Sequence, residues 1–408
     1  EIKTPAPACA ILKSANDRGA VMAGRGFLAR IAAAAALVFG AGPALAGGYD
    51  TGESDWDFVF QERAVAFEAG VTHIAPQRKL TNITGMFGPS ADVDETEAFT
   101  LPRASFAVNV ADVARCMASY REPWGGHANY GTAWTYAAAA VEQHFSSRDY
   151  GLTCAASLAA GKGRVSLLGG VSLQEVRYRL IQAFGPVTAA TDVSDRSLAW
   201  RLGLAYEIPD YALRASLIYN SAVSYDMTGT FSTVGPALPV FGSITMPQSV
   251  ELKAQSGVAP GWLAFGAVKW TDWSVVQAMP ICPVGLPACT QPAAVSGLAL
   301  GFRDTWSVTL GAAHQFSEMF ALAGNLSWNQ GASAGFTSQT DVWSAGLTGI
   351  LTPSENAVFR LGGTVGLLTA GTSSTMVLPG GIPNPLGYTA TFGNDLVWTL
   401  SGGATIRF

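Results

Sequence analysis

The last fifteen residues, Asn394 to Phe408, constrain the fold most strongly, because two kinds of side chain alternate along them. Every second residue from Leu396 onwards is apolar or small, and the residues between them are mostly polar or small. With Asn394 at its start, the first set is Asn394, Leu396, Trp398, Leu400, Gly402, Ala404, Ile406 and Phe408. This period of two predicts a strand with one face in an apolar medium. Such a strand either belongs to a soluble sandwich or closes an outer-membrane barrel, for which about 9–11 residues suffice to cross the bilayer.

Composition favours the barrel. Hydrophobic residues make up 49% of the 408 residues and charged residues only 13%, about half the usual charged share. Outside the N-terminus, however, no apolar run is long enough for a membrane helix, which excludes a helical bundle. Apolar residues spread thinly along a chain are typical of alternating membrane strands.

The N-terminus predicts a secretory signal peptide over residues 22–46. Arg25 and Arg30 form a basic region, Ile31–Val38 an apolar one, and Ala44-Leu45-Ala46 a cleavage site. Residues 1–21 are then an upstream extension without a structural role, and the mature chain begins at Gly47. Because five basic and two acidic residues lie before it, the formal net charge changes from −5 to −8. An acidic chain argues against nucleic acid as a partner.

Fourteen strand candidates follow, joined alternately by short turns and by long polar loops. Loops of such length, for example residues 226–247, count against a compact soluble domain. Short periplasmic turns, long extracellular loops and Trp or Tyr near strand ends are features of outer-membrane barrels. We therefore predict an all-β fold, a 14-stranded antiparallel transmembrane β-barrel over residues 63–408, with residues 47–62 as a short N-terminal plug. The candidates are residues 63–76, 99–110, 116–120, 138–158, 164–180, 197–208, 211–225, 248–258, 261–276, 298–316, 320–328, 340–352, 358–369 and 394–408.

Two local features affect the wall. The third strand must break near Pro123, which has no N–H for a ladder and is followed by two glycines; the break comprises Glu122, Pro123, Trp124, Gly125 and Gly126.

Cys282 and Cys289 flank a Pro-rich segment, which predicts a loop disulfide in an oxidising compartment. Cys116 and Cys154 either pair, if their strands are neighbours, or remain two separate thiols.

The inward-facing residues indicate an interior that is both apolar and cationic, which suits an amphiphile with an anionic head. The inward set also includes Lys253, Arg407, Glu207 and Glu251, and each cation alternatively pairs with a carboxylate. Ligand candidates in the lumen are Arg201, Arg214, Lys269, Arg303 and Arg360. The long loops offer an apolar groove for a first encounter, formed by Phe231, Val240, Phe241 and Met246.

Little in the sequence indicates catalysis. Gly331–Gly335 fits the Gly-x-Ser-x-Gly pattern, but it lies in a predicted loop without the strand-to-helix turn that this motif needs. Of the four histidines, His127 in the strand break and His144 on the next strand give a weak indication of a pair. We predict no enzyme, no cofactor and no metal. A general porin and a structural or adhesive barrel remain alternatives.

A resemblance supports this interpretation and extends over most of residues 58–408. It is carried by Ala199–Arg214, Met246–Val250, Ala267–Trp273 and Phe302–Gly311. In this order they resemble the long-chain fatty acid transporter family of Gram-negative outer membranes (FadL/TodX type). Residues 120–125 resemble the kink in the third strand through which that family is implied to release its substrate sideways. Residues 47–62 depart from the family, whose plug is longer and usually carries an Asn-Pro-Ala element.

The resemblance also implies partners. These are hydrophobic small molecules (fatty acids or aromatic hydrocarbons), taken up passively, and the lipid and lipopolysaccharide of the outer membrane. The strand that ends at Phe408 is expected to engage the barrel-assembly machinery. A monomer is expected.

Overall fold

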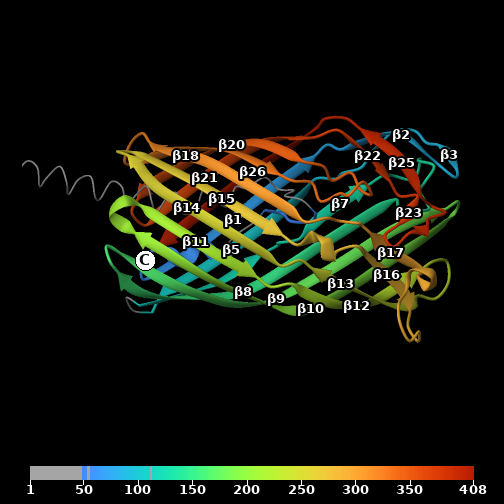
Figure 1. The fold of residues 1–408 in the computed structure, drawn as a ribbon, viewed down its shortest axis with the longest axis horizontal. Helices are drawn as coiled ribbons and strands as arrows, with labels where there is room; N and C mark the ends of the chain where they lie inside the picture. The colour runs from blue at the N-terminus through green and yellow to red at the C-terminus, as the bar shows by residue number, and fades with distance from the viewer. Residues whose placement is uncertain (1–47, 53–55, 111–112) are drawn as a thin grey trace, which may run out of the picture.

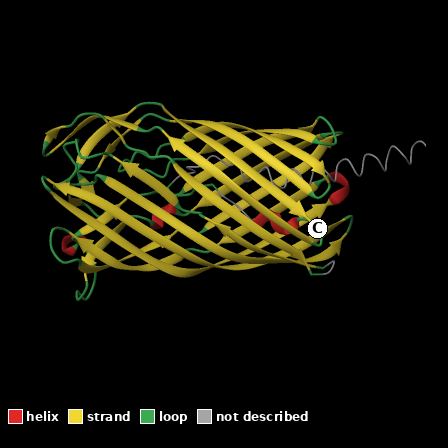
Figure 2. Cartoon of the chain, turned by 180° about the vertical axis from the view of Figure 1, so that it is seen from behind, coloured by secondary structure: helices red, strands yellow, loops and turns green. Residues whose placement is uncertain are grey.

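The computed structural model describes residues 48–52, 56–110 and 113–408, so the signal peptide and the extension predicted for residues 1–46 lie outside the described residues. The described chain forms an elongated antiparallel barrel whose strands run obliquely to its long axis (Figures 1 and 2). No helix among the described residues is long and apolar enough to cross a membrane.

The barrel sheet consists of 19 strand segments, which make up fourteen spans because five spans are interrupted. The prediction of a 14-stranded antiparallel barrel is thus confirmed. The nine continuous spans are β1 (Val65–Pro76), β5 (Phe99–Asn109), β8 (Glu142–Ala160), β9 (Gly163–Phe184), β10 (Val187–Ile208), β19 (Phe320–Asn329), β20 (Val342–Ser354), β21 (Ala357–Leu368) and β26 (Asp395–Arg407). The interrupted spans are β6 (Ala114–Arg121) with β7 (Gly125–Asn129), β11 (Leu213–Asn220) with β12 (Val223–Ser232), β13 (Leu238–Met246) with β14 (Ser249–Ala259), β15 (Trp262–Thr271) with β16 (Ala278–Pro283), and β17 (Ser296–Ala299) with β18 (Thr305–Gln315).

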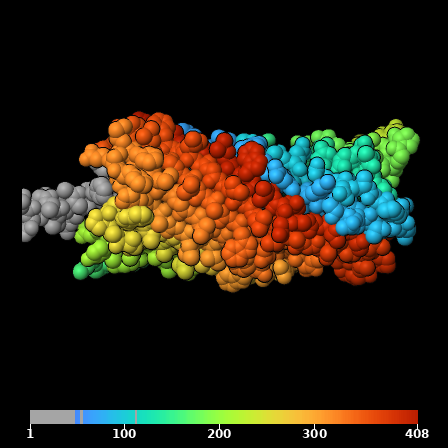
Figure 3. All heavy atoms as spheres, turned by 90° about the horizontal axis from the view of Figure 1, so that it is seen from above, coloured from blue at the N-terminus to red at the C-terminus, as the bar shows by residue number. Residues whose placement is uncertain are grey.

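The first and last spans close the barrel. β1 pairs with β26 from Ala66–Arg407 to Pro76–Val397, and Figure 3 shows the blue N-terminal part of the wall beside the red C-terminal part. Closure satisfies the backbone groups that an open sheet edge would expose to lipid.

Alternating burial along β10 shows which face meets lipid. Leu198 and Leu204 are exposed, whereas Arg201 and Glu207 are only 5% and 4% exposed. Successive side chains of a strand point to opposite faces, so the apolar set lies outside and the charged set inside. This is the arrangement that a barrel in a bilayer requires.

The two ends of the barrel differ. Short turns join the spans at the end where the C-terminus lies, including the 3₁₀ turn η3 (Pro209–Tyr211) (Figure 1). By the rule for outer-membrane barrels this end is periplasmic. The opposite end carries the 3₁₀ turn η5 (Gln291–Ala293) and two small sheets, whereas the 3₁₀ turn η4 (Trp273–Val275) joins β15 to β16. The two small sheets contain β2 (Lys79–Gly85), β3 (Gly88–Pro89), β4 (Val93–Asp94), β22 (Gly371–Ser374) and β25 (Tyr388–Phe392), and β23 (Val377–Leu378) with β24 (Ile382–Pro383).

The predicted loop over residues 226–247 is wrong, and so is the predicted end of the fifth strand at residue 180. β9 and β10 pair as far as Phe184–Val187, and β12 and β13 pair as far as Phe231–Leu238. The outward side chains in this region are polar, as in the ion pair of Arg177 with Asp192. The apolar alternation therefore ends before the hydrogen-bonded ladder does.

Candidate functional site

The third span is interrupted where the sequence contains Pro123. β6 ends at Arg121 and β7 begins at Gly125. The ladder with β5 stops at the pair Ala104–Tyr120, and the next contact is the isolated bridge Thr96–Ala128. Among the described residues, Phe99–Arg103 therefore have no ladder partner on the third span. The backbone ladder of the wall is open between the second and third spans.

The interruption is a one-residue excess relative to β8. Arg121 pairs with Asp149 and Gly125 pairs with Ser146, so three residues of the third span face two on β8. An extra residue of this kind is a bulge, which bends its strand. The Ser147 hydroxyl holds the bulge, since it accepts a hydrogen bond from the Trp124 N–H and donates one to the Trp124 carbonyl, both at 2.8 Å.

The N-terminal segment satisfies backbone groups that the bulge leaves without a ladder. The Thr51 N–H donates to the Pro123 carbonyl at 3.1 Å, and the Gly125 N–H donates to the Tyr49 carbonyl at 2.9 Å. The Thr51 hydroxyl donates to the Glu122 carbonyl at 2.8 Å. The Tyr49 ring stacks on Phe145, with ring centroids 4.5 Å apart. The segment and the interruption are thus parts of one hydrogen-bonded unit.

Gly126 leaves room for this contact, which gives a first testable prediction. A methyl group at Gly126 would lie 2.7 Å from two carbons of the Tyr49 ring. We expect Gly126→Ala to displace Tyr49 and to loosen the segment by about 1–3 kcal/mol, the usual effect of overpacking. Hydrogen–deuterium exchange of the peptide containing Thr51 should accelerate. Gly235→Ala is the control, because a methyl group at Gly235 would have no heavy atom within 4 Å. Equal exchange in the two variants would contradict the role of Tyr49.

A short 3₁₀ helix, η2 (Trp56–Phe60), fills the interior towards the short-turn end, and all five of its residues are buried. The Asp57 carboxylate lies 2.7 Å from the Lys253 ammonium, and the Trp56 indole donates to Glu251 at 3.2 Å. The Lys253 ammonium also lies 4.5 Å from the Trp56 ring centroid, a cation–π contact. Burial raises the pKa of the Asp57 carboxyl although Lys253 opposes the shift.

A cavity of about 450 Å³ lies towards the long-loop end and reaches the interrupted span. This volume falls in the usual range of small-molecule sites, roughly 300–1,000 Å³. Residues 125–128 of the third span form one side of the cavity, and Tyr49 also lines it. Aromatic and aliphatic side chains dominate the rest of the lining, including Phe99, Trp134, Tyr178, Leu300, Phe336 and Tyr388.

Two charged side chains line this cavity, and both have partners. Glu95 accepts hydrogen bonds from the Tyr130 hydroxyl at 3.1 Å and from the Ser338 hydroxyl. Burial nevertheless raises the pKa of the Glu95 carboxyl. The Arg78 guanidinium contacts Asp395 at 2.9 Å and the Thr340 hydroxyl at 2.8 Å. With its one cation engaged in this way, the cavity favours an apolar ligand without a charge.

The cations predicted to contact ligand lie outside the cavity lining, and four of them lie beside carboxylates, the alternative that the sequence left open. Arg303 is exposed, and its Nε donates to the Gly331 carbonyl at 3.2 Å. The four pairs are Arg201–Asp149 at 3.8 Å, Arg214–Glu207 at 3.1 Å, Arg360–Glu68 at 2.7 Å, and Lys269–Asp50.

The predicted loop groove is wrong. Phe231 lies on β12, and Val240, Phe241 and Met246 lie on β13. Val240 is 1% exposed and Met246 is fully buried. Both belong to the apolar cluster inside the barrel, against which Phe231 packs. The strand pairing of this hairpin turns Phe231, Val240 and Met246 inward and places Phe241 on the opposite face, so the four form no common groove on a loop.

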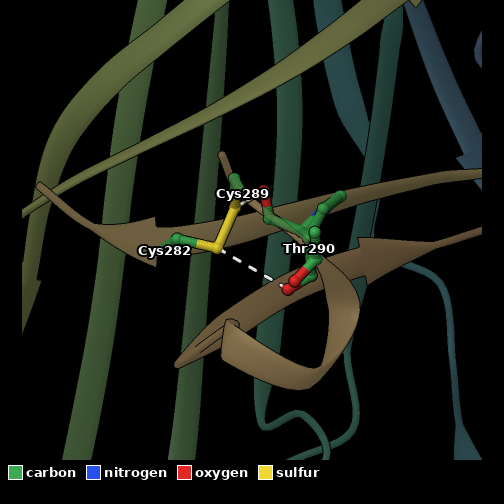
Figure 4. The surroundings of a disulfide bond; sticks show 4 residues. Cys282, Cys289 and Thr290 are labelled. Carbon is green, nitrogen blue, oxygen red and sulfur yellow. Dashed lines mark hydrogen bonds between the residues drawn. A yellow bond between two sulfur atoms is a disulfide. The ribbon is translucent and has the colours of Figure 1, made fainter. Parts of the chain in front are cut away.

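Both cysteine pairs form disulfides. Cys282 and Cys289 close a small loop, with the Cys282 sulfur 3.7 Å from the Thr290 carbonyl (Figure 4). Cys116 and Cys154 are register partners on β6 and β8. The sequence left this second pair open, because it did not establish which strands are neighbours. The Cys116–Cys154 bond fastens the third span to the fourth on the short-turn side of the interruption.

Tyr49, Arg78 and Glu95 were not identified from the sequence. Each acts through a contact with a residue far along the chain, and no local spacing signals it. The Gly-x-Ser-x-Gly pattern does not form a nucleophile site, since the Ser333 hydroxyl donates to the Thr337 carbonyl at 2.6 Å in a loop.

Comparison with known proteins relates the central part of the chain to one family and the barrel to several solved structures. Residues 151–339 match the sequence profile of the family described as outer membrane protein transport protein (OMPP1/FadL/TodX). No curated protein matches the chain. Solved structures with the same fold include a Pseudomonas aeruginosa FadL homologue, at a TM-score of 0.72 and 13% identity over 91% of this chain and 97% of that one. The Ralstonia pickettii toluene transporter TbuX has a TM-score of 0.60 and 13% identity, over 91% and 99% of the two chains. The Pseudomonas putida toluene transporter TodX has a TM-score of 0.59 and 14% identity, over 89% and 99%. Residues 151–339 thus match the OMPP1/FadL/TodX family of outer-membrane transport proteins, and the chain has the fold of these solved structures.

Proposed function

We propose that this protein takes up small hydrophobic compounds, which bind in the 450 Å³ cavity and leave sideways through the interruption in the third span. The observation that carries the proposal is the contact between the cavity and residues 125–128, where the ladder to β5 is absent. The similar toluene transporters support the same class of substrate. Catalysis is excluded by the family, whose members are transporters and not enzymes.

The route is sideways because the interior is closed between the cavity and the short-turn end. η2 and its buried contacts occupy the lumen towards the short-turn end, and we assign residues 47–62 as a plug. A ligand that passes from the cavity to lipid keeps its apolar surface away from water throughout. Each methylene group withheld from water contributes about 0.8 kcal/mol, which favours this path over an aqueous channel along the axis.

The cavity favours uncharged hydrophobic compounds over long-chain fatty acid anions. An aromatic hydrocarbon or an undissociated acid fits this lining, because the pKa of the Glu95 carboxyl is raised and the Arg78 guanidinium is already bonded to Asp395. Barrel assembly through the strand that ends at Phe408 and contact with lipopolysaccharide remain predictions.

Uptake into liposomes tests the proposal. Purified protein is inserted into liposomes that are offered labelled fatty acid, toluene or glucose. Entry of a hydrophobic compound but not of glucose is expected. Rapid entry of glucose would instead indicate a general porin, and entry of none of the three would indicate a structural or adhesive barrel.

Glu95 makes ligand binding depend on pH. Because its pKa is raised, the carboxyl becomes neutral on acidification at a higher pH than an exposed glutamate does. An alkyl sulfonate, whose charge is constant, should therefore bind more tightly as the pH falls. Even in the dielectric of bulk water two like charges 4 Å apart repel by about 1 kcal/mol, a factor of about five in affinity. Fluorescence titrations from pH 8 to pH 5 measure the change. Glu95→Gln should bind the sulfonate equally at all these pH values, and a pH dependence that persists in this variant would refute the prediction.

A further inference from the structure

Two histidines and two glutamates converge beside the interruption. His127 on β7 and His144 on β8 are register partners, and their rings stack with centroids 4.3 Å apart and planes 3° apart. His144 Nε2 lies 3.2 Å from a Glu97 carboxylate oxygen and 3.4 Å from a Glu142 carboxylate oxygen. One donor atom each from Glu97, His127 and His144 lies within 4.8 Å of the other two.

These side chains belong to the face of the sheet opposite to the one that contacts Tyr49. Gly126 and its partner Phe145 point towards Tyr49 inside the barrel. His127 and His144 follow and precede them by one residue, so they point to the other face of the sheet. The side chains of His144 and Glu142 are 30% and 27% exposed, and that of Glu97 is 44% exposed. The Glu97, Glu142 and His144 side chains are thus accessible from outside the barrel, and His127 also lines the cavity.

We propose that Glu97, Glu142, His127 and His144 bind a divalent transition-metal cation of the zinc type. Zinc bonds to imidazole nitrogen and carboxylate oxygen are about 2.0–2.2 Å long, which places the ligand atoms of a tetrahedral site about 3.3 Å apart. The two distances from His144 Nε2 already have this value. A ring nitrogen binds a metal within the plane of its ring, so the His127 ring must turn out of the parallel stack to join them.

The charges of the cluster match a divalent cation. Two ionised carboxylates and two neutral imidazoles carry a charge of about −2, and imidazole suits zinc, copper and nickel. Arg179 on β9 is the register partner of His144 and lies on the same face, where its positive charge opposes the metal. Removing this charge should therefore tighten binding.

The bound metal would join three separate segments at the edge of the interruption. Glu97 precedes β5, His127 lies on β7, and Glu142 and His144 lie on β8. The segment before β5 reaches the third span through the Glu97 N–H to His127 carbonyl hydrogen bond and the Thr96–Ala128 bridge. A cation held by Glu97 and His127 adds a bond between the second and third spans at the long-loop end of the open ladder.

Metal titration tests the site without reference to transport. Tag-free full-length protein in detergent is stripped with a chelator and then titrated with Zn²⁺ by calorimetry and with Co²⁺ by visible absorption. One equivalent should bind, and Co²⁺ should give the intense bands of a tetrahedral site. His144→Gln and His127→Gln should each lower the affinity for Zn²⁺ by at least tenfold, and Arg179→Gln should raise it.

His73→Gln is the matched control, since His73 lies on β1 beside Thr100 and Trp398, away from the cluster. It should bind Zn²⁺ like the unaltered protein. Circular dichroism verifies the fold of each variant. Absence of Zn²⁺ binding in the unaltered protein, or equal binding in folded His144→Gln and His127→Gln, would overturn the proposal and would mean that His144 serves as a hydrogen-bond partner of the two carboxylates. Neither result bears on uptake of hydrophobic compounds.

Discussion

A protein that lacks only Pro123 is expected to lose uptake of hydrophobic compounds while keeping a folded barrel. Three residues of the third span, 122–124, face two residues of β8. With one residue removed, the pairs Arg121–Asp149 and Gly125–Ser146 become parts of a single regular ladder. The wall can then close between the second and third spans, because a strand without a bulge does not bend away from its neighbour. We expect uptake into liposomes to fall at least about tenfold, as no path through a continuous hydrogen-bonded wall remains.

Pro123→Ala is the matched control for this deletion. It keeps the extra residue, and with it the bulge and the carbonyl that accepts from Thr51, so uptake should be close to normal. Deleting Glu122–Gly126 also removes the excess residue and should act like the deletion of Pro123. Heat-dependent mobility in gels and circular dichroism verify that each barrel is folded. Normal uptake by a folded protein without Pro123 would refute the sideways route.

The wall of the barrel could be predicted from the sequence because the alternation of apolar and polar residues within each strand shows which face lies outside. In β10 the exposed Leu198 and Leu204 and the buried Arg201 and Glu207 are separated by the period of two that the sequence displays. The interruption could be predicted for the same reason, since Pro123 lacks a ladder donor whatever lies around it. Both features depend on residues that are close along the chain.

The interior could not be predicted, because its contacts join residues far apart in the sequence. Arg360 meets Glu68, Lys253 meets Asp57, and Glu95 meets Ser338. Most of the inward cations predicted to contact a ligand are therefore paired with carboxylates, and less positive charge is available to a ligand than the sequence indicates. The hairpin of β12 and β13 was missed for another reason. Beyond the bilayer both faces of a strand meet polar surroundings, so alternation no longer distinguishes a strand from a loop.

Opening the lumen by removing aromatic side chains of η2 is expected to convert the closed barrel into an ion-conducting one. Trp56, Phe58 and Phe60 are at most 4% exposed and belong to one buried cluster. Replacing a buried Phe or Trp with Ala costs about 3–5 kcal/mol, so Trp56→Ala/Phe58→Ala/Phe60→Ala should release the helix. Planar-bilayer recordings should show discrete ionic currents that the unaltered protein lacks. The control is Phe67→Ala/Phe106→Ala/Phe359→Ala, whose side chains are exposed on the outer wall.

The ion pair between Asp57 of η2 and Lys253 of the wall offers an independent way to open the lumen. Lys253→Met leaves the Asp57 carboxylate buried without its ammonium partner, and removal of one member of a buried pair costs about 3–5 kcal/mol. This variant should conduct ions intermittently, and Asp57→Asn/Lys253→Met, which also removes the Asp57 charge and leaves only Glu251 without the ammonium, should conduct less often. Uptake of toluene should persist in all these variants, because the sideways route does not pass η2. If the aromatic variant is folded and carries no current, the helix does not seal the lumen; if it conducts and toluene uptake fails, the substrate leaves along the axis.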